Sequence, residues 1–234
     1  MTLVAQRFDP GAPPSDPAPP GPGEPPRLWL VDSAATAAGA ARLAPDVLDA
    51  GERRRAAAFH FDHDRDAYVS AHVALRMLLG AYLGTAPGAV TFVRETCPTC
   101  GGPHGRPAVP EGRPHFSLSH TRGLSLLAFA AGTVGADVEE VPRGPAADGV
   151  WQTLHPREVA ELQALAEPER AAAFARAWVR KEAYLKALGT GLSRDLSADY
   201  LGTAATPPPG PAGWQVHDVA AGADHLAAIA VREG

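Results

Sequence analysis

Hydrophobic and polar residues alternate along the first part of the chain in a way that predicts short strands and longer helices. A continuous apolar run at residues 28–31 has the length of a short buried strand. Apolar residues at helical spacing predict two helices, over roughly residues 45–59 and 64–82, and residues 90–94 have the pattern of another strand. We therefore expect the order strand, helix pair, strand.

The second part repeats this order after a proline- and glycine-rich connection at residues 97–114. Short apolar or alternating runs predict its strands, and apolar residues three and four positions apart predict its helices. The predicted strands are residues 115–119, 124–131, 134–141, 214–219 and 226–231, and the predicted helices are residues 156–166 and 168–188.

The two longest predicted helices end alike. Residues 74–80 read Ala-Leu-Arg-Met-Leu-Leu-Gly and residues 183–189 read Ala-Tyr-Leu-Lys-Ala-Leu-Gly, and glycine suits the position just after a helix. The sequence thus predicts an α+β protein of two similar α/β halves related by pseudo-twofold symmetry, with a ligand cleft between them. We expect residues 27–113 to form the amino-terminal half and residues 114–234 the carboxy-terminal half.

Composition narrows the class of protein. Residues 1–26 are crowded with proline, glycine and alanine, which predicts a disordered extension. The net charge of -5 argues against general nucleic-acid binding, and two cysteines in 234 residues suggest a reducing compartment. No apolar run approaches the ~20 residues that span a bilayer. We expect a soluble cytoplasmic protein that binds neither nucleic acid nor membrane.

Two carboxylates stand two residues apart on a predicted strand. Asp137 and Glu139 project from the same face while Val138 packs behind them. Their Cβ atoms would lie roughly 6 to 7 Å apart, close enough for both side chains to reach one magnesium ion. The alternative is a strand end whose acidic side chains lie in water, which is the commoner meaning of an isolated pair.

The last long helix carries a second group of charges. Lys181 and Lys186 are the only lysines of the chain, and Glu182 lies four residues before Lys186, so a carboxylate and an amine share one helix face. A lysine, unlike an arginine, can give up its proton in a tuned site, so chemistry is one possible reason for this clustering. The alternative is an ordinary surface ion pair that contributes only a few tenths of a kcal/mol.

A serine and a histidine end the predicted strand before the turn at residues 121–123. The hydroxyl of Ser119, the imidazole of His120 and the backbone donors of the turn suit a phosphate. A hydrolytic serine and histidine pair is disfavoured, because adjacent strand residues point to opposite faces and no Gly-x-Ser-x-Gly turn is present.

Together, His-Phe-Ser-Leu-Ser-His at residues 115–120, Gly-Ala-Asp-Val-Glu at residues 135–139 and the Trp-Val-Arg-Lys-Glu segment from residue 178 resemble one family. In this order and at this spacing they are similar to the 4′-phosphopantetheinyl transferases of the surfactin-synthetase-activating (Sfp) type. That resemblance implies transfer of the 4′-phosphopantetheine group of coenzyme A to a serine of an apo acyl or peptidyl carrier protein, with release of 3′,5′-ADP.

The resemblance also implies roles for the charged residues. Asp137, Glu139 and Glu182 would surround a magnesium ion in the carboxy-terminal half, and Glu182 would take the proton of the carrier serine. Lys186 would stabilise or protonate the departing 3′,5′-ADP, and Lys181 would contact phosphate.

Further residues would bind coenzyme A if the resemblance holds. The segment His104, Gly105, Arg106 and Pro107 matches the stretch that packs around the adenine end. The 3′-phosphate would be contacted by Ser119, His120, Arg53 and Arg55.

Several alternatives stay open at this stage. A carrier-binding relative that lost catalysis would keep the fold, and another magnesium-dependent phosphotransferase should show a P-loop, which the sequence lacks. Cys97 and Cys100, with His104 and His115 nearby, could supply four zinc ligands, although one Cys-x-x-Cys is only half of such a site. The two-half form implies a monomer, and carriers of polyketide or nonribosomal peptide synthesis as partners.

Overall fold

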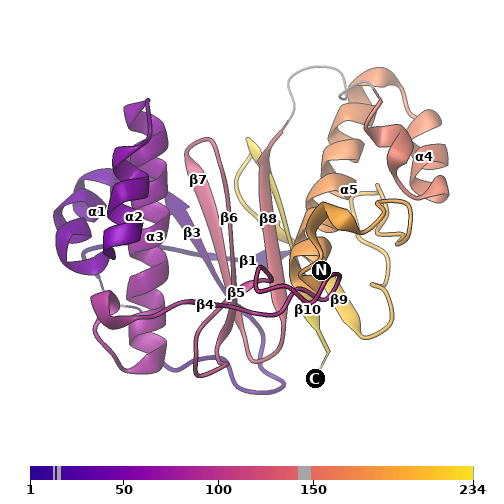
Figure 1. Cartoon of the computed structure of the whole chain (residues 1–234). Helices are drawn as coiled ribbons and strands as arrows, with labels where there is room; N and C mark the ends of the chain where they lie inside the picture. Colours follow the sequence, from indigo (N-terminus) through magenta and orange to yellow (C-terminus); the bar gives the residue numbers. More distant parts are fainter. Residues whose placement is uncertain (13, 15–16, 142–148, 234) are drawn as a thin grey trace.

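The computed structural model describes residues 1–12, 14, 17–141 and 149–233, and it has a mixed α+β fold (Figure 1). One four-stranded sheet has the order β2-β3-β7-β6, with β2 parallel to β3 and the other neighbours antiparallel. These strands are β2 (Gln6–Arg7), β3 (Arg27–Asp32), β6 (His115–Thr121) and β7 (Leu124–Ala130).

The second four-stranded sheet has the same pattern of pairing in the order β1-β9-β10-β8. Again a short edge strand, β1, runs parallel to its neighbour, and the other pairs are antiparallel. The strands are β1 (Leu3–Val4), β8 (Val134–Glu140), β9 (Trp214–Ala220) and β10 (His225–Arg232).

Apolar side chains fill the space between the two sheets. Leu30 and Leu126 of the first sheet belong to the same buried cluster as Val138 and Ile229 of the second. The opposite face of each sheet packs against a long helix, α3 (Asp62–Leu83) on the first and α5 (Glu167–Leu188) on the second. The molecule is therefore layered as helices, sheet, sheet, helices (Figure 1).

The amino-terminal helices differ from the prediction. The chain forms α1 (Ser33–Val47) and α2 (Ala50–Ala57) where one helix over residues 45–59 was predicted, so that prediction was wrong. The break lies at Asp49, whose side chain accepts the backbone N–H of Glu52 and caps the start of α2. Helix α3 covers the predicted residues 64–82, beginning two residues earlier and ending one residue later.

The other predicted elements agree more closely. All five predicted strands after residue 114 are present, and the predicted helices 156–166 and 168–188 correspond to α4 (Pro156–Gln163) and α5. The predicted strand at residues 90–94 is reduced to β4 (Val93–Arg94), which pairs with β5 (Pro107–Ala108) inside the predicted connection.

The first residues of the chain differ from a disordered extension. Strand β1 pairs with β9 of one sheet, β2 pairs with β3 of the other, and Phe8 belongs to the buried core beside α3. Proline explains why the following residues form no regular element, but the apolar residues before them can still be buried. Residues 13, 15 and 16 of the predicted extension lie outside the described residues.

Along the chain, the change from one sheet to the other does not fall at residue 114. Strands β6 and β7, which the prediction assigned to the carboxy-terminal half, pair with β3 in the amino-terminal sheet. The predicted domain boundary stays a prediction. In the described part of the chain, no helix combines the length and the apolar character needed to cross a membrane.

Candidate active site

Strand β8 and helix α5 lie in direct contact because residue 135 is glycine. A Cβ atom at this position would overlap the carbonyl oxygen of Ala183 and the backbone nitrogen of Ala187. The close approach brings Asp137 of β8 within reach of Lys186 near the end of the helix. Gly135 therefore sets the spacing of the charged groups.

Asp137, Ser119 and Lys186 form a closed network of hydrogen bonds. Lys186 Nζ lies 2.6 Å from Asp137 Oδ1 and donates to Ser119 Oγ at 2.9 Å. Ser119 Oγ in turn donates to Asp137 Oδ1 at 2.8 Å. Asp137 is only 2% exposed, so these two partners offset the cost of burying its charge. The network joins β6, β8 and α5 at one point.

The second carboxylate oxygen of Asp137 is different. Asp137 Oδ2 is buried, and within the described part of the chain it has no hydrogen-bond partner. A buried oxygen without a partner is rare in a folded protein and calls for an explanation. A hard cation bound there would supply one, because magnesium prefers carboxylate oxygen.

Glu139 and Glu182 complete the acidic group. Burial raises the pKa of Glu182, and the charge of Asp137 raises it further, although Lys186 opposes this. Burial also raises the pKa of Glu139, with Asp137 as the second cause, while Lys186 and a hydrogen bond with Thr121 act in the opposite direction. Both carboxyl groups thus hold a proton more tightly than a glutamic acid in water.

Three carboxylates around one ammonium group fit a divalent cation by charge and by donor type. Asp137 acts on both glutamates, so all three lie within electrostatic reach of one another. The carboxylate oxygens of the three residues do not all lie as close together as the ligand atoms of an occupied metal site. Among the described residues, the only three His, Cys, Asp or Glu side chains with ligand atoms within 4.8 Å of one another are Cys97, Cys100 and His104. Magnesium at Asp137, Glu139 and Glu182 stays a prediction.

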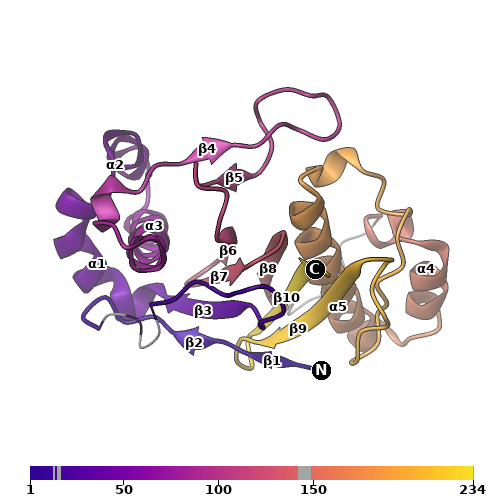
Figure 2. The same cartoon turned by 90° about the horizontal axis from the view of Figure 1, so that it is seen from below.

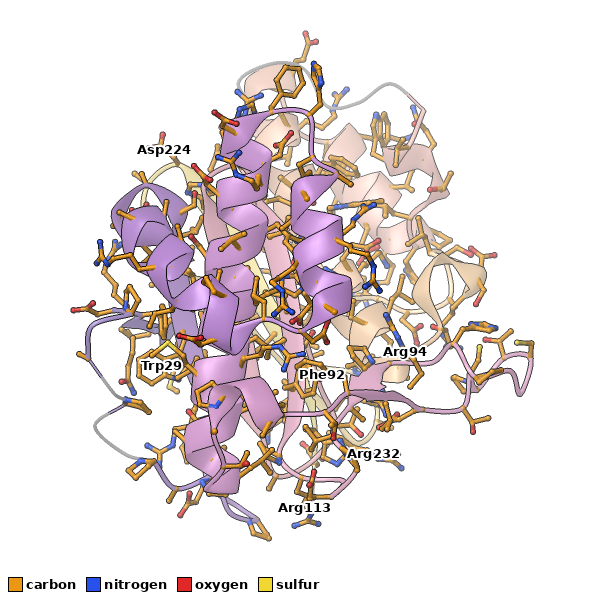
Figure 3. All side chains as sticks on the ribbon, turned by 60° about the vertical axis from the view of Figure 1, so that its left-hand side comes forward. Trp29, Phe92, Arg94, Arg113, Asp224 and Arg232 are labelled. Carbon is orange, nitrogen blue, oxygen red and sulfur yellow. The ribbon has the colours of Figure 1, made fainter. Side chains whose placement is uncertain are left out.

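A hollow of about 530 Å³ opens beside the network and is lined by Lys186. Helix α3 lines it with His72 and Leu75, and Phe92 and Arg94 also line it, where the chain crosses between α3 and α5 (Figure 3). The predicted adenine segment contributes His104, Gly105, Arg106 and Pro107.

Arg106 fixes this segment to both halves of the molecule. Its guanidinium contacts Glu95, with Nε 3.0 Å from Oε2, and donates to the carbonyl oxygen of Ala187 in α5. Arg94 donates to the carbonyl oxygen of Gly105 at 3.2 Å. The segment is therefore held beside the end of α5 that carries Lys186.

A second hollow, of about 570 Å³, lies by His120 and Thr121. Tyr68 of α3 lines it and stacks on His72, which lines the first hollow, with ring centroids 3.9 Å apart. Burial lowers the pKa of His72. The Ser119 and His120 pair thus connects the charged network to the second hollow.

The position of Lys181 does not agree with the prediction that this residue contacts phosphate. Its side chain is buried between α4 and α5, where Nζ lies 2.8 Å from Glu158 Oε2 and donates to the carbonyl oxygen of Asp199 at 2.6 Å. Burial lowers the pKa of Lys181, and Glu158 opposes the shift. A lysine held in this way is not available to a phosphate, because adjacent helix residues point about 100° apart and Glu182 faces the site.

Arg53 and Arg55 lie on α2, and both have partners within the protein. Arg53 donates to the carbonyl oxygens of Leu48 and Pro45 near the end of α1. Arg55 lies over the ring of Phe59, 5.4 Å from its centroid. Both are exposed, and their predicted contact with a 3′-phosphate stays a prediction.

Some residues at the site were not predicted from the sequence. His72 and Arg94 line the first hollow, and Thr121 bonds to Glu139. His72 had one available signal, since it lies four residues after Tyr68 on the predicted helix and therefore on the same face. Arg94 ends the predicted strand at residues 90–94 and Thr121 ends β6 just before a turn, and neither position by itself marks a ligand site.

Comparison with known proteins shows similarity to one superfamily over part of the chain. Residues 133–219 match the family model of the 4′-phosphopantetheinyl transferase superfamily. This stretch contains β8, α5 and β9, and with them Asp137, Glu182 and Lys186.

Three curated relatives are also named 4′-phosphopantetheinyl transferases, one of them as putative. The chain is 32% identical over 154 residues to the 4′-phosphopantetheinyl transferase HetI of Nostoc sp., covering 63% of this chain and 62% of that protein. It is 27% identical over 179 residues to the putative 4′-phosphopantetheinyl transferase slr0495 of Synechocystis sp., covering 74% and 68%.

A third relative extends the comparison. A 4′-phosphopantetheinyl transferase of Bacillus subtilis is 26% identical over 153 residues, which is 65% of each chain. The matched regions span about two thirds of these relatives. With the match at residues 133–219, they make the chain similar to the 4′-phosphopantetheinyl transferase superfamily over part of its length.

Proposed function

We propose that this protein transfers the 4′-phosphopantetheine group of coenzyme A to a serine of an apo acyl or peptidyl carrier protein, in a magnesium-dependent reaction of the Sfp type. The observation that carries the proposal is the network of Asp137 Oδ1, Ser119 and Lys186, beside which the buried Oδ2 of Asp137 has no hydrogen-bond partner among the described residues. The superfamily match covers most of this network.

In this reaction the serine oxygen of the carrier attacks the β-phosphorus of coenzyme A. A new bond forms between that oxygen and the phosphorus, and the bond to the oxygen bridging the two phosphates breaks. The serine proton goes to Glu182, and 3′,5′-ADP leaves with the electron pair of the broken bond. The raised pKa of Glu182 suits this role, because a base works best when its pKa is near the working pH.

Lys186 is placed to meet the leaving group. Its side chain is about one third exposed, and its ammonium group is held by Asp137 and Ser119, so it lines the first hollow in a fixed position. A fixed positive charge at the bridging oxygen stabilises the charge that develops there. The same group can donate a proton to the departing 3′,5′-ADP.

Magnesium would be held by Asp137, Glu139 and Glu182. The unpaired Oδ2 of Asp137 and the oxygen-only donor set fit this ion. When bound, it neutralises charge on the diphosphate of coenzyme A. It would also offset the negative charge of Asp137, which after burial is the second cause of the raised pKa values of the two glutamates.

Coenzyme A would extend through the hollows on either side of the network. Gly105, Arg106 and Pro107 line the first hollow and suit the adenine end, while His120 and Thr121 line the second and suit a phosphate group. Lys181 is left out of this set because it is paired with Glu158.

The matching sheets favour an internal duplication. In each half, a first strand is followed by helices and then two strands, and the last strand lies in the middle, as in β3-β7-β6 and β8-β10-β9. We propose that the halves are related by a pseudo-twofold axis and that the protein acts as a cytoplasmic monomer. Carriers of polyketide or nonribosomal peptide synthesis are the proposed partners.

The test is to incubate the protein with coenzyme A, magnesium and several apo carrier proteins, and to follow the mass of each carrier. We expect a gain equal to the phosphopantetheine group, which is lost with a chelator or when the carrier serine is replaced by alanine. A carrier that binds without gaining mass would favour a non-catalytic relative. No gain on any carrier would reject the proposal.

A further inference from the structure

The loop between β4 and β5 contains a group of side chains that the proposed reaction does not use. Cys97, Cys100 and His104 each offer one ligand atom, and these atoms all lie within 4.8 Å of one another. Both cysteines are free thiols. Cys97 is buried, whereas Cys100 and His104 are exposed. Figure 2 shows the loop reaching from β4 toward α5.

The spacing of these atoms matches that of ligands around zinc. Tetrahedral bonds of about 2.3 Å to sulfur and 2.0 Å to nitrogen put two sulfur ligands about 3.8 Å apart and a sulfur and a nitrogen about 3.5 Å apart. Cys100 Sγ and His104 Nε2 are 2.9 Å apart, so this pair needs to open by only about half an ångström.

The backbone of the loop is shaped around Cys97. Gly101 donates its N–H to the carbonyl oxygen of Cys97 at 2.9 Å, and Cys97 donates to that of Gly102 at 2.8 Å. Gly101 has a φ of 73°, which glycine adopts without strain. The backbone N–H groups of Cys100 and Thr99 point at the Cys97 sulfur and lower the pKa of its thiol. These contacts fix both cysteines on one side of a tight turn.

We propose that Cys97, Cys100 and His104 bind one zinc ion, with solvent at the fourth position. Thiolate and imidazole are ligands that favour zinc over magnesium, so the site is chemically separate from the carboxylate group on β8 and α5. His115 does not belong to this ligand group, which corrects the four-ligand site considered from the sequence.

A metal here would make the loop rigid where it forms the wall of the first hollow. The ligand His104 also lines that hollow, and Arg106 contacts α5 two residues later. Thr99 at the tip of the loop lies 3.3 Å from Ser193 Oγ, just beyond α5. Zinc would therefore hold a segment that bridges the two halves. The binding itself does not depend on the proposed transfer reaction.

The first experiment measures metal in the full chain, produced without a histidine tag in zinc-supplemented medium and dialysed under reducing conditions. Elemental analysis should find about one zinc per chain. Replacing zinc by cobalt should produce a thiolate-to-cobalt charge-transfer band in the near ultraviolet. Absence of both zinc and this band from the folded wild-type protein would overturn the proposal.

The second experiment uses variants with a control from the same loop. Cys97→Ser combined with Cys100→Ser should lower the zinc content to less than about a tenth of the wild-type value, and His104→Ala should weaken zinc retention against a chelator. Thr99→Ala changes the loop without removing a ligand, so it should keep its zinc.

Two outcomes would count against the site. If the cysteine double variant keeps all of its zinc, the metal is bound elsewhere. If mass measurement finds a Cys97–Cys100 disulfide in wild-type protein kept under reducing conditions, the two cysteines form a redox pair and do not bind metal. If the double variant does not fold, the cobalt band of the wild-type protein and the weaker retention of metal against a chelator in His104→Ala decide the question.

Discussion

The long helices α3 and α5 are built on one plan. Each has 22 residues, and each ends at a glycine with positive φ, Gly84 and Gly189. Gly80, which the sequence comparison matched with Gly189, lies inside α3, so that match was wrong by four residues. Each packs on the outer face of a four-stranded sheet. A helix of eight residues with a capping box accompanies each one, α2 beside α3 and α4 beside α5.

The agreement extends to single buried charges. Arg76 and Lys181 each lie eight residues before the glycine that ends the helix, and each pairs with the capping-box glutamate of the short helix. Arg76 Nε is 2.6 Å from Glu52 Oε2, and Lys181 Nζ is 2.8 Å from Glu158 Oε2. One glutamate therefore both begins a short helix and neutralises a buried cation.

The helices differ at the positions that face the site. Seven residues before the glycine, α5 has Glu182 where α3 has Met77, and three residues before it, α5 has Lys186 where α3 has Ala81. The comparison separates two kinds of charge in one helix. Lys181 belongs to the shared framework, whereas Glu182 and Lys186 occur in one half only, as expected of groups that perform chemistry.

The largest effect should come from Glu182→Gln. Removing the proposed base should lower turnover about 10² to 10⁴-fold while coenzyme A binding changes little, because the amide keeps the size of the side chain. Carrier mass gain against time measures turnover, and calorimetry measures binding.

Two controls accompany this variant. Glu169→Gln makes the same change in the first turn of α5, and Met77→Leu changes the matching position of α3, and both should keep turnover within about twofold. Unchanged turnover of Glu182→Gln would remove this residue from the mechanism.

Lys181→Met should mainly destabilise the fold. Glu158 is fully buried and would lose its ammonium partner, which costs about 3 to 5 kcal/mol when a buried pair is broken. Arg76→Met should cost less, because Asp49, a second partner of Arg76, is half exposed and Glu52 is 11% exposed. Denaturant unfolding measures both.

The same variants test the role of Lys181. At a temperature where the variant is folded, its KM for coenzyme A should match that of the wild type, and Glu158→Gln in the Lys181→Met background should restore part of the stability. A large rise in KM without loss of stability would return Lys181 to the phosphate site.

The two halves should respond to pH with opposite sign. The pKa values of Glu139 and Glu182 are raised above 4.5 in the folded chain, so between 4.5 and the raised values the folded state holds more protons and stability falls as pH rises. The pKa of His72 is lowered below 6.5, so stability falls as pH drops through that value.

Added magnesium allows the effect of the two glutamates on stability to be separated from that of His72. It competes with protons at Glu139 and Glu182, so the rise in Tm on adding magnesium should be small at low pH and should increase through the window of the two glutamates. Thermal unfolding with and without magnesium at each pH measures this. A magnesium effect that is equal at every pH, or unchanged in Glu139→Gln, would contradict the proposed ligands.

The smallest effect should come from Arg55→Ala. An exposed arginine contributes up to about 1 kcal/mol to an ionic contact, so KM for coenzyme A should rise at most about fivefold, less at high salt, with kcat unchanged. Arg54→Ala on the same helix is the matched control. Arg53 is unsuitable because it bonds to Leu48. Equal KM values for both variants would remove Arg55 from the phosphate site.

The sequence predicted the six strands of six or more residues well, because each is a short apolar or alternating run, but it missed the two-residue strands β1, β2 and β5. It failed for α1, whose buried face is made largely of Ala40 and Val47 and gives a weak apolar signal. Pro45 was interpreted as the start of a helix, although it lies in the last turn of α1. The real start of the next helix depends on the side chain of Asp49, a local hydrogen bond that periodicity does not record.

The sequence predicted which charged residues belong to the site, but it did not predict which of them contact one another. Sequence spacing paired Glu182 with Lys186, whereas in the structure Lys186 bonds to Asp137 and Ser119. The direction in which each residue of a helix points depends on how the helix packs on its sheet. Here the close contact at Gly135 fixes that packing. That is why Lys181, one residue from Glu182, could be assigned to the site in error.

The short strands β1 and β2 have a kinetic consequence. Leu3 pairs with Val219, about two hundred residues along the chain, and Gln6 pairs with Trp29 of the other sheet. A contact between such distant residues pays a large loop-closure entropy before it gains anything. We therefore expect β1 to dock on β9 late in folding, and a reporter attached beside β1 would record a late step of assembly.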